Sequence, residues 1–200
     1  MKSEPPPSLA TTVVAADALT PSATATELLI LCTGNAARSV MAGFMLEHLQ
    51  LGRAPAAPLH IVTAGTHTID GQPMGLRTRS ALLGIPELAE AALGRHRSRQ
   101  VYEADLKRAE LVVVMEADHV RFVRRQFPEA ADRTATITRL CEDLPPAPPS
   151  LAERVAALEL AGAPLSDEED VIDPAGGDET TYAACVAELW LLCQRLITLL

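Results

Sequence analysis

The sequence has no apolar stretch long enough to cross a membrane. A transmembrane helix needs about 18 or more consecutive apolar residues, and polar or charged residues interrupt every apolar stretch of this 200-residue chain. The N-terminus also lacks the pattern of a secretory signal, because Glu4 and three prolines follow Lys2, and Asp17 interrupts the later apolar residues. We therefore expect a protein that neither spans a membrane nor is exported.

Basic residues and cysteines are scarce as well. Seventeen Lys and Arg stand against 26 Asp and Glu, which gives a net charge of −9. A nucleic-acid-binding surface needs positive charge to neutralise phosphates, so broad nucleic-acid binding is excluded, although a small basic pocket for one anion is not. The four cysteines are too widely spaced for a disulfide framework. We expect a protein of the reducing cytoplasm.

The remaining composition is that of a folded domain. Apolar residues make up 48% of the chain and charged residues 22%, which is an ordinary globular balance. The length suits one domain. We expect a flexible tail rich in Ala, Pro, Ser and Thr over residues 1–26, followed by one domain over residues 27–200.

Apolar runs alternate with segments of helical periodicity along that domain. Strands are expected at 28–31, 59–64, 111–115 and 135–140, and helices at 40–49, 78–83, 118–126, 151–160 and 180–199. Fully apolar strands that alternate with helices are typical of a parallel sheet covered on both faces. We therefore predict an α/β fold with three αβα layers and a four-stranded parallel sheet. The basic stretch 95–125 and the acidic stretch 142–179 are interpreted as solvated faces.

The segment 32–39, Cys-Thr-Gly-Asn-Ala-Ala-Arg-Ser, directly follows the first predicted strand. Cys32 ends that strand and faces a helix N-terminus, whose free N–H groups and partial positive charge favour a thiolate. Arg38 adds a full positive charge, and its planar guanidinium can hold two phosphate oxygens. The segment therefore combines a nucleophile with a positive clamp for an anion.

The residues between Cys32 and Arg38 suit a loop that curls around one tetrahedral anion. Gly34 and Asn35 tolerate a positive φ, and Ala36 and Ala37 add little bulk. A cysteine and an arginine six positions apart are common by themselves, in which case Cys32 would be a small buried residue. The strand before the segment, the Gly-Asn pair within it and the serine after it favour the anion loop.

Residues 32–39 resemble the signature loop of the low-molecular-weight protein tyrosine phosphatases. Four further segments resemble segments of that family in the same order, and the resemblance spans roughly 27–196; they are 63–66, 96–100, Met115-Glu116 and Asp173-Pro174. The Asp-Pro pair resembles the loop that supplies the general acid, although Asp-Pro alone is a frequent turn. The resemblance implies the expected three-layer fold, with the signature loop after the first strand.

The resemblance also implies a reaction and its residues. Cys32 would attack phosphorus and form a phosphocysteine, Asp173 would act as general acid and then as base, and Arg38 would stabilise the phosphoryl oxygens. The implied phosphate-binding loop is Thr33, Gly34, Asn35, Ala36, Ala37, Arg38 and Ser39. The implied supporting residues are Ser39, which hydrogen-bonds the leaving thiolate, and Asn35, Thr63 and His96, which hold the loop. No metal ion or other cofactor is implied, and the expected partner is a phosphorylated protein or a small phosphate ester.

Two departures from the family pattern bear on regulation and substrate. Many members carry a second cysteine inside the loop, where this chain has Ala37. Aromatic residues that flank the cleft in the family are replaced by Ile69 and by Ala175-Gly176-Gly177. An aromatic wall stacks on a phenol ring, so the sequence predicts an open cleft and leaves a phosphotyrosine preference undecided.

Two other functions remain open at this stage. Arsenate reduction with an external thiol would need only Cys32, whereas a thioredoxin-coupled reductase needs two further cysteines close together on a mobile segment. Cys185 and Cys193 lie in a predicted helix and fit that need poorly. A non-catalytic phosphate-binding module would need neither Cys32 nor Asp173, so their joint presence favours the phosphatase. The sequence predicts no oligomeric state.

Overall fold

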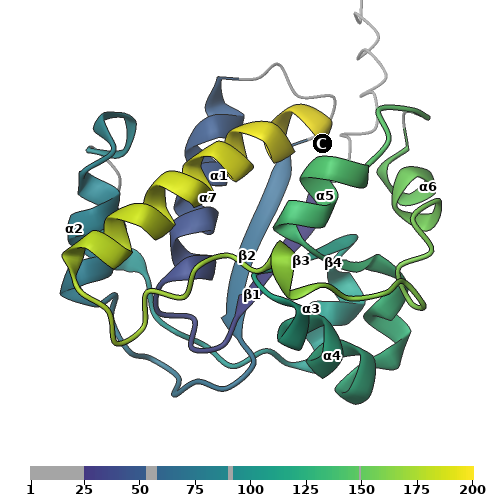
Figure 1. The fold of residues 1–200 in the computed structure, drawn as a ribbon, viewed down its shortest axis with the longest axis horizontal. Coiled ribbons are helices and arrows are strands. Elements are labelled where there is room, and N and C mark those ends of the chain that lie inside the picture. The colour runs from purple at the N-terminus through teal and green to yellow at the C-terminus, as the bar shows by residue number, and fades with distance from the viewer. Residues whose placement is uncertain (1–24, 53–57, 90–91, 149) are drawn as a thin grey trace, which may run out of the picture.

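The computed structural model describes residues 25–52, 58–89, 92–148 and 150–200 (Figure 1). The predicted N-terminal tail over residues 1–26 lies outside the described residues, apart from its last two positions.

A four-stranded parallel sheet forms the centre of the domain, as predicted. Its strands are β1 (Thr26–Cys32), β2 (Leu59–Gly65), β3 (Leu111–Val114) and β4 (Thr134–Thr136), arranged in the order β2-β1-β3-β4. All three neighbouring pairs are parallel, and Cys32 is in register with Gly65 of β2. The carboxyl ends of the strands therefore meet at one edge of the sheet, where ligands bind in folds of this kind.

Helices cover both faces of the sheet, which confirms the three-layer fold (Figure 1). One face carries α1 (Arg38–Leu51), α2 (Leu76–Leu83), α5 (Ile137–Asp143), α6 (Leu151–Ala156) and α7 (Glu179–Leu199). The opposite face carries α3 (Glu103–Arg108) and α4 (Ala117–Gln126). In β1, Leu28 and Ile30 pack into the first layer, and Leu29 and Leu31 pack into the second. An unbroken apolar strand is required because both of its faces are buried.

The expected fourth strand over 135–140 is wrong in its second half. β4 ends at Thr136, and α5 begins at the next residue. The Thr136 hydroxyl caps this helix by accepting a hydrogen bond from the backbone N–H of Arg139. A short apolar run does not distinguish a buried strand from a buried helix, and the capping threonine is the signal that separates them here. The expected helix 151–160 is also shorter, because α6 ends at Ala156.

Helix α7 is long and apolar enough to cross a membrane by length and composition alone. In the fold it lies across α1 (Figure 1), and one of its faces is buried in the core. The buried residues of α7 are Cys185, Val186, Leu189, Cys193, Leu196 and Ile197. Their burial accounts for the apolar composition of α7 as that of a core helix.

Candidate active site

The segment 32–39 forms a loop that joins the carboxyl end of β1 to the first turn of α1. Cys32 is the last residue of β1 and is 3% exposed, and Arg38 is the first residue of α1 and is 2% exposed. The Ser39 hydroxyl lies 3.0 Å from Cys32 Sγ. A cysteine sulfur, a helix N-terminus and a buried guanidinium therefore meet in one short loop.

Asn35 stabilises the shape of this loop from inside. Its φ is +46°, a left-handed conformation that asparagine adopts more readily than most residues. Its side-chain Nδ2 donates to Ser39 Oγ at 3.1 Å and to Thr63 Oγ1 at 3.0 Å. Its Oδ1 accepts from the backbone N–H of Arg99 at 3.0 Å, and its carbonyl accepts from His96 Nε2 at 3.0 Å. Asn35 thus connects the loop to β2 and to the segment 96–99.

The pKa of His96 is lowered, chiefly by burial and against the effect of its bond to the Asn35 carbonyl. A neutral ring still donates one N–H, so His96 can keep this bond without carrying a charge.

The backbone carbonyls of the loop point outward. Those of residues 32 to 36 accept hydrogen bonds in turn from Thr66 N, His67 N, Thr68 Oγ1, His96 Nε2 and Thr78 Oγ1. In a planar trans peptide the N–H points opposite to the carbonyl. The N–H groups of residues 33 to 37 therefore point into the loop, as in an anion-binding nest.

Gly65 allows β2 to approach this loop closely. A Cβ at this position would lie 2.7 Å from the Thr33 carbonyl oxygen and 3.0 Å from the Asn35 nitrogen. Both contacts are with backbone atoms, which cannot rotate away. Any side chain at residue 65 would therefore displace the loop.

Arg38 is held by two carboxylates. Its Nη1 donates to Glu116 Oε2 at 2.5 Å, and its Nη2 lies 2.8 Å from Asp173 Oδ2. Burial by itself would lower the pKa of Arg38, but the hydrogen bond and charge of Glu116, together with Asp173, raise it. Arg38 is therefore cationic at any physiological pH.

Asp173 reaches Arg38 from a segment that is anchored at the strand ends. Glu169 accepts from the Thr136 hydroxyl at 2.5 Å and pairs with Arg139. Asp170 Oδ1 accepts from the backbone N–H of Ala117, the first residue of α4, at 2.7 Å. These two carboxylates contradict the interpretation of the whole acidic stretch as a solvated face, because each one satisfies donors at the carboxyl edge of the sheet.

The backbone of the same segment makes further contacts with the site. The N–H of Val171 donates to the Met115 carbonyl at 2.8 Å, and its own carbonyl accepts from Arg38 at 3.4 Å. Asp173 Oδ1 accepts from the N–H of Ala175 at 3.1 Å, so the Asp-Pro pair is also a turn. The Asp173 side chain is 45% exposed and lies at the mouth of the loop.

The structure brings together the residues that the sequence proposed: Cys32, Arg38 and Asp173, with Ser39, Asn35, Thr63 and His96 around them. Sequence reasoning missed the contacts of Glu116, which entered only through the family resemblance, and of His119 and Asp170. No local pattern marks these three residues, because each acts on a segment far away in the sequence.

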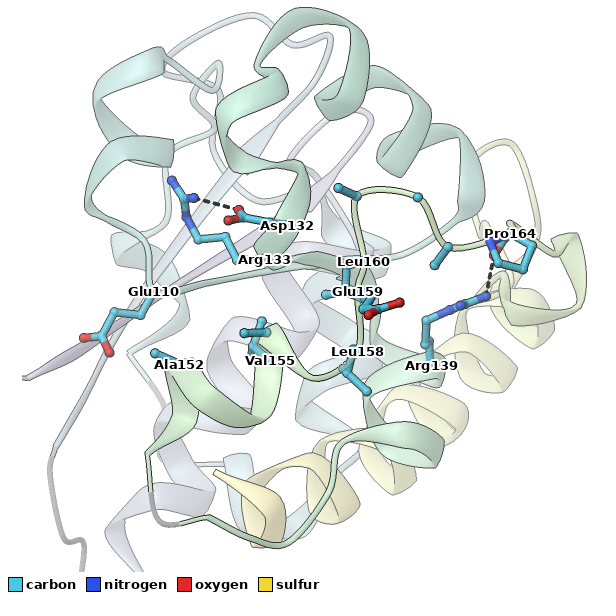
Figure 2. Close-up of a pocket in the computed structure, with 14 residues that line it drawn as sticks. Glu110, Asp132, Arg133, Arg139, Ala152, Val155, Leu158, Glu159, Leu160 and Pro164 are labelled. Atoms are coloured by element: carbon cyan, nitrogen blue, oxygen red, sulfur yellow. Dashed lines mark hydrogen bonds and ion pairs between the residues drawn. The ribbon is translucent and has the colours of Figure 1, made fainter.

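Two cavities of the described residues differ in their distance from the loop. A cavity of about 840 Å³ lies between residues 152–164 and the segment that carries Arg133 and Arg139 (Figure 2). Neither the loop 32–39 nor Asp173 lines it. A second cavity of about 660 Å³ adjoins the loop at Gly34, Asn35 and Ala36 and continues past Ile69, which is 73% exposed. This cavity therefore adjoins the loop, and a smaller one of about 240 Å³ reaches Thr63 and His96.

The comparisons with known proteins agree with this geometry. The family model described as low molecular weight phosphotyrosine protein phosphatase matches residues 27–147. A protein-arginine-phosphatase from Geobacillus stearothermophilus is 29% identical over 171 residues, which cover 84% of this chain and 92% of that protein.

Solved structures give the same result. The arginine phosphatase from Geobacillus stearothermophilus is similar with a TM-score of 0.64 and 26% identity, over 86% of this chain and 91% of that one. The low molecular weight protein tyrosine phosphatase from T. tengcongensis is similar with a TM-score of 0.66 and 27% identity, over 88% and 100%. All of these relatives are phosphatases.

Proposed function

This chain belongs to the low molecular weight phosphotyrosine protein phosphatase family, and on that premise we propose that Cys32, Arg38 and Asp173 carry out its phosphatase chemistry. The observation that carries the proposal is the meeting of these groups: Asp173 pairs at 2.8 Å with Arg38, six residues after Cys32 in the same loop. A nucleophile, an anion clamp and a proton donor are the groups that hydrolysis of a phosphate monoester needs.

In the first step the Cys32 thiolate attacks phosphorus in line with the leaving oxygen. The S–P bond forms as the P–O bond breaks, and protonated Asp173 gives its proton to the leaving oxygen. The inward-pointing N–H groups of residues 33 to 37 and the guanidinium of Arg38 bind the three remaining oxygens, where negative charge is concentrated. The product alcohol leaves, and a phosphocysteine remains.

In the second step water replaces the sulfur. Asp173, now a carboxylate, takes a proton from the water, whose oxygen attacks phosphorus while the S–P bond breaks. Ser39 Oγ, 3.0 Å from Cys32 Sγ, donates a hydrogen bond to the departing thiolate. Inorganic phosphate leaves, and Asp173 is protonated again for the next cycle.

The ion pair between Arg38 and Asp173 adds one requirement. The guanidinium that binds the phosphoryl oxygens also holds the Asp173 carboxylate. When a phosphoryl group binds, its oxygens accept hydrogen bonds from the N–H groups of Arg38 that face Asp173. Asp173 then moves from the guanidinium to the leaving atom. The exposure of Asp173 on its turn allows this exchange without any change in the loop 32–39.

Asn35, Thr63 and His96 support the reaction indirectly in this proposal. Their hydrogen bonds fix the carbonyls of the loop outward, so its N–H groups stay directed at the anion. Thr63 lies on β2, and the absence of a side chain at Gly43 of α1 lets its methyl group approach; a Cβ there would lie 2.6 Å from Thr63 Cγ2.

A phosphorylated protein is the substrate class that the family implies. Within it, we propose phosphoarginine as a second candidate beside phosphotyrosine. Ile69, which lines the cavity beside the loop, and Ala175, in the turn after Asp173, stand where the family resemblance implies aromatic residues that would suit a phenol ring. The guanidine leaving group of phosphoarginine becomes a cation when protonated, and the exposed Asp173 carboxylate can pair with it. The relative from Geobacillus stearothermophilus bears the name of an arginine phosphatase.

The first test is metal-free hydrolysis of p-nitrophenyl phosphate by the wild type, Cys32→Ser and Asp173→Ala. We expect turnover that is abolished in Cys32→Ser and has a lower kcat in Asp173→Ala. Arsenate consumption with an added thiol, in place of phosphate release, would support the reductase instead. Phosphate binding without either activity would support the binding module.

The substrate test compares two peptides of one sequence that carry phosphotyrosine or phosphoarginine. A higher kcat/KM for phosphoarginine supports the second candidate, and Ile69→Trp is then expected to shift the ratio toward phosphotyrosine. A higher kcat/KM of the wild type for the phosphotyrosine peptide would contradict the phosphoarginine proposal.

We further propose that the protein works in the cytoplasm and that residues 27–200 form its single domain. All four cysteines are free thiols, which suits a reducing compartment. Burial raises the pKa of Cys141 to about 11 and of Cys185 to about 12, so these two thiols stay protonated and unreactive.

A further inference from the structure

His119 is a buried histidine beside the site that the proposed reaction does not use. It lies in the first turn of α4 and is 2% exposed. Its Nε2 is 3.0 Å from Thr33 Oγ1 and 3.3 Å from Glu116 Oε1. Its Nδ1 is buried and has no hydrogen-bond partner among the described residues.

These neighbours determine which ring nitrogen carries the proton. Burial, and next the charge of Arg38, lower the pKa of His119 to about 3, so the ring is neutral and has one N–H. A proton on Nδ1 would leave a buried donor without an acceptor and would turn the Nε2 lone pair toward the Glu116 carboxylate. Both effects cost free energy. The proton therefore resides on Nε2, which donates to the Thr33 hydroxyl oxygen and faces the Glu116 carboxylate.

With this tautomer, a chain of close polar contacts runs from the ring into the site. The His119 ring faces Glu116 Oε1, and Glu116 Oε2 accepts from Arg38 Nη1. Arg38 Nη2 in turn holds Asp173. The Glu116 carboxylate thus lies between the ring and the guanidinium: Oε1 is 3.3 Å from His119 Nε2, and Oε2 accepts from Arg38.

Thr33 connects the same ring to the loop. Thr33 directly follows Cys32, and its carbonyl is bound from the other side by the N–H of His67. His119 therefore contacts both the loop and the carboxylate that orients Arg38. A change in the position of the ring would alter the position of the guanidinium relative to the loop N–H groups.

We propose that His119 is a positioning residue, which orients Arg38 through Glu116 and aligns the guanidinium with the phosphate-binding loop through Thr33. This inference rests on the proposed role of Arg38 in holding the phosphoryl group. It assigns no chemical step to His119, because the ring touches neither Cys32 nor Asp173 in the hydrogen bonds of the site.

The test uses two polar substitutions that place an amide N–H at different positions. The side-chain nitrogen of Gln reaches the position of Nε2, whereas that of Asn reaches only the position of Nδ1. We expect kcat/KM for p-nitrophenyl phosphate to stay within about threefold of wild type in His119→Gln and to fall about 10-fold in His119→Asn. The inhibition constant of inorganic phosphate should rise in His119→Asn in parallel. His60→Asn, at an exposed position of β2, is the matched control and should change neither value.

Repeating His119→Asn in a protein that already carries Glu116→Gln distinguishes a positioning role of His119 from a general effect on folding. If His119 acts through Glu116, then His119→Asn should lower kcat/KM less than about threefold once Glu116→Gln is present, because coupled residues are not additive. Equal losses in both backgrounds, or equal losses in His119→Gln and His119→Asn at an unchanged Tm, would overturn the inference. Full activity in Cys32→Ser would instead reject the proposed function itself, so the two failures are distinguishable.

Discussion

The two segments that meet at Arg38 are held in place in different ways. In the loop 32–39, the carbonyls of residues 32–36 and the Asn35 side chain are all hydrogen-bonded, and Cys32, Asn35, Arg38 and Ser39 are buried. The segment 169–173 is held by the Glu169 and Asp170 carboxylates, which bind partners 33 and 53 residues earlier in the chain. Both segments thus depend on distant partners, but the loop is held at nearly every residue, whereas the position of Asp173 depends on contacts of the residues just before it.

Among the substitutions considered, we expect the largest loss of activity from one at Gly65, which packs against the loop 32–39. Gly65→Ala would place a Cβ 2.7 Å from the Thr33 carbonyl oxygen. We expect about 2 kcal/mol lower stability and about 100-fold lower kcat/KM, because a small displacement of catalytic groups is costly. Thermal unfolding and p-nitrophenyl phosphate hydrolysis measure both. Gly94→Ala is the control, since its Cβ would meet no atom within 4 Å; equal behaviour of the two variants would contradict the role of Gly65.

The next largest loss is expected at Asn35, where two substitutions distinguish the contribution of the backbone conformation from that of the hydrogen bonds. Asn35→Ala loses the side-chain bonds to Ser39, Thr63 and Arg99 and keeps an unfavourable positive φ. Asn35→Gly loses the same bonds but accepts that φ. We expect about 30-fold lower kcat/KM in Asn35→Ala, with Asn35→Gly more stable than Asn35→Ala by about 1 kcal/mol. If Asn35→Ala proves as stable as Asn35→Gly, the positive φ carries no cost.

We expect a smaller loss of activity from a substitution at Asp170, in the segment that carries Asp173. Asp170→Ala removes the acceptor for the N–H of Ala117 and loosens the segment that carries Asp173. We expect kcat to fall about fivefold with KM nearly unchanged, because proton donation suffers while the loop still binds phosphate. Glu168→Ala is the control, because the Glu168 side chain is exposed on the same segment. A rise in KM at constant kcat would show that Asp170 acts on binding instead.

The last prediction concerns the contribution of His119 to stability, which changes on acidification. Burial and the charge of Arg38 lower its pKa to about 3 from an ordinary 6.5. The folded state therefore binds this proton less readily than the unfolded chain. The stability that results is complete above about pH 6.5 and is lost as the pH falls toward 3, by about 1.4 kcal/mol per pH unit. The charged or titratable groups around the ring are Arg38, Glu116, Asp118, Asp173 and His67.

Thermal unfolding of the wild type and His119→Gln between about pH 7 and pH 4 measures this contribution. The Tm of the wild type should fall more steeply with acid than that of His119→Gln, which cannot bind the proton. Parallel curves would assign the acid sensitivity to other groups.

The parts of the molecule that the sequence predicted correctly share a local origin. The apolar strands and the alternation with helices follow from burial on both faces, and the loop 32–39 follows from one contiguous motif. The end of β4 at Thr136 was missed because an apolar run gives the same signal in a strand and in a helix. Glu116 and His119 were missed because their partners in the fold, Arg38 and Thr33, lie about 80 residues earlier in the chain. Charged residues in a run look solvated until the fold supplies their partners, as it does for Glu169.

The most direct test of the central claim is to trap the covalent intermediate on Cys32. Wild-type protein and Asp173→Ala are mixed with p-nitrophenyl phosphate and quenched within the first turnover, and the peptides are then analysed by mass spectrometry. The account predicts one phosphoryl group on the sulfur of Cys32, which accumulates more in Asp173→Ala if loss of the base slows hydrolysis more than loss of the acid slows its formation. A phosphoryl group on another residue, or turnover without any covalent adduct on Cys32, would contradict it.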